Sequence, residues 1–192
     1  MSLLIHPYAV DLDELRHIVG SRNASYLRAL REQFAEDLAD LDASDDEDAE
    51  GDDRVISATD ALADLIAGGP YREGWHHAPK YGYVLRLLCE DRGEMRPNSW
   101  TFAEEADRLL EAAGVPAPVL RVGDHLTYRG APVAMPEPDD FPSIGYLEAT
   151  EARVALRALP RSAVGCEPML SEIRGWLDYC SNQMVGLVAF TF

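Results

Sequence analysis

Apolar residues recur with helical spacing through most of this chain and with the character of strands at its two ends. Residues 2–10 are apolar and extended, and Pro7, which cannot donate to a sheet, places them at a sheet edge or strand end. Residues 185–192 form a nearly continuous apolar, β-branched and aromatic run, which predicts a strand covered on both faces. We expect these two strands to pair.

Between the terminal strands, apolar positions at spacings of three and four predict a series of helices, which glycine and proline punctuate. The predicted helices lie at residues 11–20, 24–41, 57–68, 83–93, 101–114, 150–160 and 167–180. Thr150 is the predicted N-cap of the helix that stops at Pro160. Residues 144–147 are extended, and the proline-rich residues 115–142 fit either a small hairpin or a distorted helical turn around Gly123-Asp124.

These elements predict a mostly helical α+β fold with a small sheet, in one domain of residues 1–192. Residues 42–53 contain no apolar side chain larger than alanine and many like charges. Such a segment cannot bury enough surface to offset its ordering entropy, so we predict a mobile acidic loop within the domain.

The formal net charge of −17 is concentrated, because 11 of the 34 acidic residues lie in residues 36–53, which contain no Lys or Arg. Negative charge is repelled by phosphate backbones, so nucleic-acid binding is disfavoured and a basic protein partner is favoured. The longest apolar run is far shorter than the ~20 residues of a membrane span. With no basic leader before the first apolar residues, we expect a cytoplasmic protein.

Residues 139–159, DDFPSIGYLEATEARVALRAL, followed by EIRGWLDYCSNQ and VGLVAFTF, resemble the YfbM-like bacterial domains of unknown function. Tyr146-Leu147 matches the aromatic-Leu start of the motif of that family, while the proline expected after Thr150 is missing. The segment GGPYREGWHHAPKYGYVLRLLCE looks like a related uncharacterised group from GC-rich bacteria. The resemblance implies an α+β fold and a bacterial cytoplasmic setting, and it carries over no catalytic residue.

Six rings fall within residues 71–83, which we call the ring-rich segment. They are Tyr71, Trp75, His76, His77, Tyr81 and Tyr83. Rings with polar tips serve as binding anchors, and histidines titrate near neutral pH, so the segment is a candidate ligand or partner site. The same rings also suit a lid that packs on the core.

Arg153 and Arg157 share one face of the helix before Pro160 and form a second candidate site, for an anion or an acidic group. Neighbouring acids such as Glu148 and Glu151 are the alternative partners of these arginines. With Arg161 and Arg174 added from a packed last helix, the patch would be larger.

Metal and cofactor sites are not predicted. Asp46-x-Asp48-x-Glu50-Gly51 starts like a calcium loop, but the twelfth position is Ser57, where a glutamate is needed. Three widely spaced cysteines suit neither a disulfide framework nor a zinc site. Cys89 facing His76 or His77 is the one arrangement that would suit a thiol nucleophile.

No GxSxG, GxGxxG, phosphate loop or HExxH motif occurs, which leaves the chain without the signature of a common enzyme class. We therefore expect an acidic cytoplasmic interaction domain that binds a basic protein, as immunity proteins do. The alternative is a small-molecule-binding protein or enzyme with a pocket under the ring-rich segment, using His76 or His77 with Glu90.

Overall fold

The computed structural model describes residues 4–43, 55–95, 99–100, 103–139, 141–160 and 168–192. It is a mostly helical α+β fold, as predicted, and its small antiparallel sheet joins the two ends of the chain. Strand β1 (Leu4–Val10) pairs with β5 (Gly186–Thr191), with Tyr8 opposite Val188. The predicted pairing of the terminal strands is confirmed.

Three short strands complete the sheet. Strand β4 (Ser143–Leu147) pairs with the free side of β5, while β2 (Gly93–Met95) and β3 (Ser99–Trp100) pair with opposite ends of β1. The order is therefore β2-β1-β5-β4, with β3 also on β1. The sequence pattern did not predict β2 or β3, because strands of two and three residues are too short to show an alternation.

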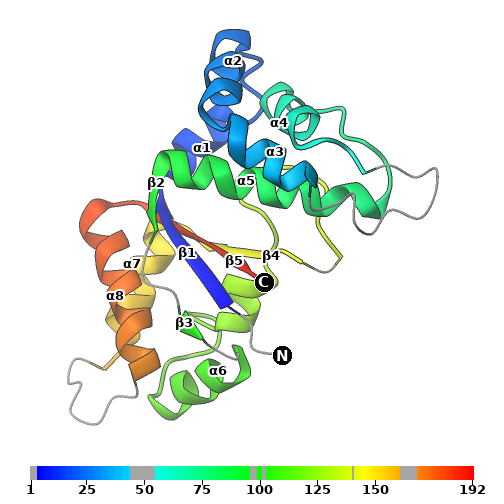
Figure 1. Cartoon of the computed structure of the whole chain (residues 1–192). Coiled ribbons are helices and arrows are strands. Elements are labelled where there is room, and N and C mark those ends of the chain that lie inside the picture. The colour runs from blue at the N-terminus through cyan, green and yellow to red at the C-terminus, as the bar shows by residue number, and fades with distance from the viewer. Residues whose placement is uncertain (1–3, 44–54, 96–98, 101–102, 140, 161–167) are drawn as a thin grey trace.

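Helices cover both faces of the sheet (Figure 1). One face packs on α1 (Leu12–Ile18), α2 (Ala24–Gln33), α3 (Ala35–Ala43), α4 (Ala58–Ala67) and α5 (Ala78–Arg92). The other packs on α6 (Ala103–Ala112), α7 (Ala149–Ala158) and α8 (Pro168–Gln183). Alternate residues of β5 enter the two cores, Val188 and Phe190 on one side and Leu187 and Ala189 on the other. β5 is therefore covered on both faces, as predicted.

The predicted helix at 24–41 is two helices, since the backbone turns at Phe34 (φ −100°, ψ 23°) between α2 and α3. Phe34 is buried together with Leu30 and Leu38, so the apolar stripe continues across the break. The spacing of apolar residues therefore could not reveal the break. α3 runs to Ala43, so the first two residues of the predicted acidic loop 42–53 are helical. The rest of that loop, and the calcium-loop fragment in it, lie outside the described residues.

The proline-rich region contains a π-helical turn, η2 (Val122–Thr127), so the distorted helical alternative is correct there and the hairpin is not. Asp107 of α6 holds its start, accepting from Val122 N at 2.6 Å and Gly123 N at 3.2 Å. The turn lies against β4, and Gly130 N donates to Ile144 O at 2.9 Å. η2 therefore packs on one face of the sheet, over β4 and β5, and Gly130 just after it bonds to β4.

The N-cap of α7 is Glu148, so the prediction of Thr150 is wrong by two residues. Glu148 and Glu151 form a capping box in which Glu148 N donates to Glu151 Oε2 at 2.8 Å. The two glutamates therefore satisfy backbone N–H groups at the start of α7, which is the role that Thr150 was expected to have. Within the described residues, no helix is both long and apolar enough to cross a membrane.

Candidate functional site

Two tyrosines hold the ring-rich segment against the helices. Tyr81 is fully buried, and its hydroxyl donates to Asp64 Oδ2 at 2.8 Å and accepts from Arg72 N at 2.9 Å. Tyr71 meets Tyr81 edge to face, with ring centres 5.3 Å apart, and its hydroxyl donates to Ala134 O at 2.6 Å. Burial, together with the hydrogen bond to Asp64, raises the pKa of Tyr81 to about 12. Tyr81 is therefore a protonated structural anchor at neutral pH.

The two histidines lie in a short 3-10 helix, η1 (Trp75–His77). His77 Nδ1 accepts from Ile56 N at 3.1 Å, and the rings of His76 and His77 are 4.0 Å apart. Trp75 is 74% exposed and is the ring of this turn that a partner can reach. In the part of the chain that the structure describes, no group of three His, Cys, Asp or Glu residues could hold a metal ion.

A hollow of about 370 Å³ lies beside the ring-rich segment, lined by Tyr71 together with Arg16 and residues 132–134. Neither His76 nor His77 is among the described residues that line it. Glu90, the expected partner of these histidines, instead accepts from Tyr8 OH at 2.6 Å. The structure therefore does not bring together the residues that the enzyme alternative requires.

Tyr83 and Cys89 lie apart from the histidines on α5. The ring of Tyr83 stacks on Phe192, with ring centres 5.7 Å apart and planes 20° from parallel. Cys89 is fully buried, and this burial raises the pKa of its thiol. A buried thiol with a raised pKa holds too little thiolate to act as a nucleophile at neutral pH.

Arg153 and Arg157 are exposed on α7. Their predicted neighbours have other roles, because Arg174 Nη2 donates to Leu159 O at 2.9 Å and to Pro160 O at 2.6 Å and so caps the end of α7. Arg161 lies outside the described residues. Of the two further cations that were expected, the described one, Arg174, is therefore engaged with backbone carbonyls.

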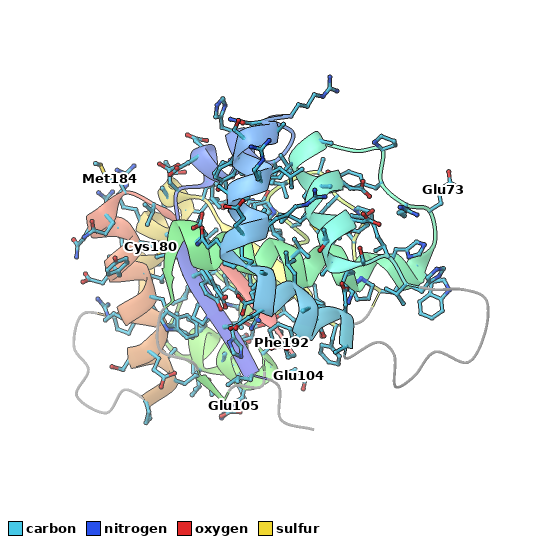
Figure 2. All side chains as sticks on the ribbon, turned by 45° about the horizontal axis from the view of Figure 1, so that its top comes forward. Glu73, Glu104, Glu105, Cys180, Met184 and Phe192 are labelled. Atoms are coloured by element: carbon cyan, nitrogen blue, oxygen red, sulfur yellow. The ribbon has the colours of Figure 1, made fainter. Side chains whose placement is uncertain are left out.

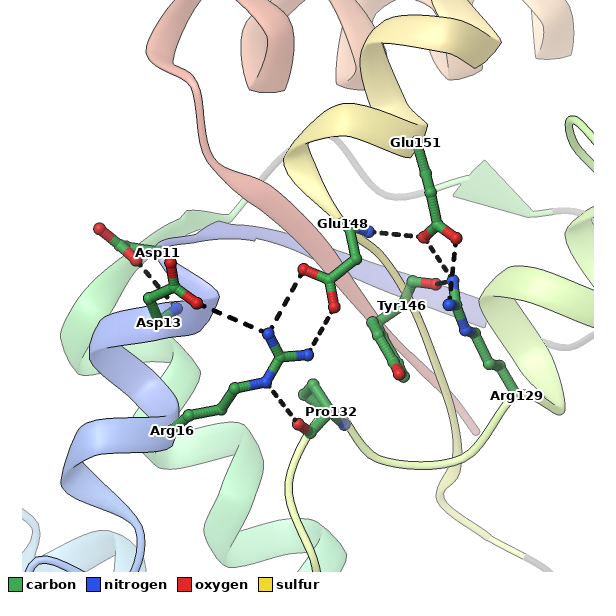
Figure 3. Close-up of polar contacts among 8 residues, drawn as sticks. All are labelled: Asp11, Asp13, Arg16, Arg129, Pro132, Tyr146, Glu148 and Glu151. Carbon is green, nitrogen blue, oxygen red and sulfur yellow. Dashed lines mark hydrogen bonds and ion pairs between the residues drawn. The ribbon is translucent and has the colours of Figure 1, made fainter.

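The acids expected to neutralise Arg153 and Arg157 bind two other arginines (Figure 3). Arg16 Nη2 lies 2.5 Å from Glu148 Oε1, and Arg129 holds Glu151 through two hydrogen bonds of 2.6 and 3.1 Å. The Arg129 guanidinium also lies over the ring of Tyr146, 4.1 Å from its centre. The block at 139–159 is thus tied to α1 and to the segment after η2 by structural ion pairs.

A different surface has the features of a binding site. Tyr128, just after η2, is 73% exposed. It lines two neighbouring hollows with volumes of about 330 and 630 Å³. The first hollow contains Glu137 and Asp139, with Phe141 as a second ring. We call the residues that line either of these two hollows, taken together, the Tyr128 surface.

The second hollow is also acidic, since α6 and η2 supply Glu104, Glu105, Asp107 and Asp124. Figure 2 labels Glu104 and Glu105 at the lower edge of the molecule. Two of these acids are already bound. Glu105 Oε1 lies 2.5 Å from Arg108 Nη2, and Asp107 caps η2.

The remaining carboxylates of the Tyr128 surface are exposed and make no ion pair with a described residue. They are Glu104, Asp124, Glu137 and Asp139. Negative charge is therefore unneutralised on both sides of an exposed tyrosine. This arrangement can bind a cation, because carboxylates attract it and the face of an aromatic ring adds a cation–π contact.

Sequence reasoning missed the Tyr128 surface because it depends on tertiary structure. Its acids come from α6, η2 and the loop before β4, and no periodicity links them. The available signal was a tyrosine between Asp124 and Glu137. Residues 123–140 contain no Lys and one arginine, so little positive charge offsets the acids there. That arginine, Arg129, is bound to Glu151.

Comparison with known proteins gives one match. A family model described as a domain of unknown function, DUF7691, covers residues 1–192. No curated protein and no solved structure matches the chain.

Proposed function

Since the chain belongs to the DUF7691 family, whose description assigns no activity, we propose that it is an interaction domain that binds a basic protein through the Tyr128 surface. The observation that supports this function is the pair of acidic hollows that share the exposed Tyr128. Tyrosine is enriched at the energetic centres of protein interfaces, since its ring buries a large area and its hydroxyl retains a polar contact.

Charge supports a basic partner over a neutral one. The whole chain carries a formal charge of −17, which would steer a cationic protein toward it and increase the association rate at low salt. At the surface itself, four carboxylates without ion pairs to described residues provide short-range complementarity. Binding should then weaken with salt, because exposed charges are screened beyond ~10 Å at 0.1 M ionic strength.

This proposal corresponds to the immunity-like function expected from the sequence, with the binding site moved from the ring-rich segment to the Tyr128 surface. We also propose a cytoplasmic, bacterial, single-domain protein, and a distant relationship to the YfbM-like domains. Nucleic acid, membrane and cofactor have no place in this proposal.

The experiment uses a fluorescent oligo-arginine peptide as the cationic probe and measures its anisotropy with the full chain at low and moderate salt. Two variants test the surface, Tyr128→Ala and the double change Glu137→Gln with Asp139→Asn. Each should weaken binding at least about five-fold, roughly 1 kcal/mol, as for a central interface residue.

Matched controls distinguish the surface from overall charge. Trp75→Ala removes a ring of nearly equal exposure, and Glu32→Gln with Asp37→Asn removes two charges from exposed positions of α2 and α3. Both controls should bind as the unmodified chain does. If they weaken binding as much as the Tyr128-surface variants do, attraction is nonspecific and the proposed site is wrong.

A further inference from the structure

A second polar cluster surrounds Phe192, where α5 lies over the end of the sheet. It consists of His6, Tyr8, Tyr83, Arg86, Glu90 and Phe192. The ring of His6 meets Phe192 edge-on at 5.3 Å, and the Arg86 guanidinium carbon lies 5.7 Å from the centre of the same ring. These residues share a face, because His6 and Tyr8 are two apart on a strand, while Arg86 and Glu90 are four apart on a helix.

Arg86 has unused hydrogen-bonding capacity. Its Nε is shielded from solvent and has no hydrogen-bond acceptor. Glu90 Oε1 is 3.8 Å away, which permits an ion pair but not a hydrogen bond. The guanidinium donates no hydrogen bond to a described residue, although arginine carries five N–H donors. The Arg86 side chain is 27% exposed, so an acceptor from solvent can reach its remaining N–H groups.

The neighbouring groups do not provide that acceptor. Glu90 Oε1, the oxygen nearest Arg86 Nε, already accepts from the Tyr8 hydroxyl at 2.6 Å. His6 makes no hydrogen bond with a described residue. Burial lowers the pKa of His6, the charge of Arg86 lowers it further, and Glu90 partly opposes both. At neutral pH, His6 is therefore a neutral ring with one N–H donor available.

We infer that Arg86 and His6 form a binding site for a small oxyanion, the chemistry shared by phosphate and carboxylate groups. Oxygens of the ligand would accept from the fork of N–H groups on Arg86 and from His6, and the rings of Phe192 and Tyr83 would border the site. Tyr8 and Glu90 are positioning residues, because they hold the site without supplying a donor to the ligand. None of these residues belongs to the Tyr128 surface.

NMR of the imidazole protons tests the site in the full chain. Inorganic phosphate and acetate are titrated in separate series at constant ionic strength, with chloride as the balancing anion. We expect a saturable shift of the His6 signal and a higher His6 pKa with the bound anion, because nearby negative charge favours the imidazolium. His17, exposed on α1, is the internal control and should not respond.

Saturation by phosphate alone assigns the site to phosphate groups, and saturation by acetate alone assigns it to carboxylates. Arg86→Gln should weaken the saturable response at least ten-fold, and Arg86→Lys should weaken it less, since lysine retains charge but not the planar fork. Arg86→Lys also stands in if Arg86→Gln does not fold. The inference is overturned if His6 shows no saturation, responds as His17 does, or responds equally when Arg86 is replaced by either residue.

Discussion

Arg129 lies over the ring of Tyr146 and also donates to its carbonyl oxygen at 2.9 Å. The same guanidinium binds both oxygens of Glu151, the acid of the capping box on α7. One arginine thus links the segment after η2 to β4 and to the start of α7, both of which lie well beyond it in the sequence.

Replacing Arg129 with Ala should destabilise the fold by about 1–2 kcal/mol. Hydrogen bonds to charged groups contribute roughly 1.5–3 kcal/mol, and partial solvent exposure reduces that contribution here. Urea unfolding followed by circular dichroism measures the change. Arg108→Ala is the control, because Arg108 forms its ion pair with Glu105 on the exposed face of α6 and should leave the midpoint unchanged. Equal effects of the two variants would contradict the structural role of Arg129.

Glu151 should make the stability depend on acid pH. Partial burial raises its pKa, but the hydrogen bonds from Arg129 and Glu148 N outweigh burial and lower it below the ordinary value. The unfolded chain therefore takes up this proton first as pH falls. The contribution of Glu151 is complete above its unfolded pKa and is lost as pH falls through its folded pKa.

Denaturation midpoints between neutral pH and pH ~3 test this effect, since unfolded glutamate titrates near pH ~4.3. Over that interval, Glu151→Gln should lose less stability than the unmodified chain does. Glu32→Gln, which removes an exposed carboxylate, is the matched control and should lose as much as the unmodified chain. A pH profile of Glu151→Gln that parallels the unmodified chain would show that the Arg129 ion pair contributes nothing.

Tyr81→Phe should loosen the start of the ring-rich segment. The change leaves Arg72 N without its acceptor and Asp64 without its donor, each at the cost of an unsatisfied polar group, about 1–3 kcal/mol if it stays buried. Hydrogen exchange at the amide of Arg72 should accelerate. Tyr128→Phe changes an exposed ring and is the control, which should leave this exchange rate unchanged. If Tyr81→Phe also leaves the rate unchanged, the hydrogen bond from Arg72 N to Tyr81 is wrong.

The terminal strands and most helices could be predicted from sequence because each has a local signal. Val188 and Phe190 lie in an unbroken apolar run, and a proline after Leu159 stops α7. The break at Phe34 could not be predicted, since its apolar stripe continues through it. The Tyr128 surface and the Phe192 cluster needed the fold, because Asp107 reaches η2 from another helix and Glu90 reaches Tyr8 across 82 residues of chain.

Cys89 should be inert in the folded protein. Cys89 and Cys180 are buried, and burial raises the pKa of the Cys89 thiol. In a Cys166→Ser variant, a thiol reagent should react only as fast as the chain unfolds, and denaturant should accelerate it. Rapid reaction under native conditions, faster than hydrogen exchange in the core, would instead show an accessible thiolate and reopen a nucleophilic role.

Gly145 should be essential to the contact between β4 and η2. A Cβ at this position would collide with the backbone of His125 and Leu126, which a rotamer change cannot relieve. Gly145→Ala should therefore destabilise the protein by about 3 kcal/mol or prevent folding, as overpacking against backbone does. Thermal unfolding measures this change.

Gly175 provides the opposite case, on α8. A Cβ there meets no atom within 4 Å, and alanine restricts the unfolded chain and favours the helix. Gly175→Ala should accordingly stabilise the protein by about 0.5–1 kcal/mol. Because both changes add a single methyl group, opposite shifts in melting temperature would isolate the packing of η2 on β4 as the cause. A tolerated Gly145→Ala would mean that η2 lies farther from β4 than the structure places it, and the position of Tyr128 beside both hollows would have to be revised.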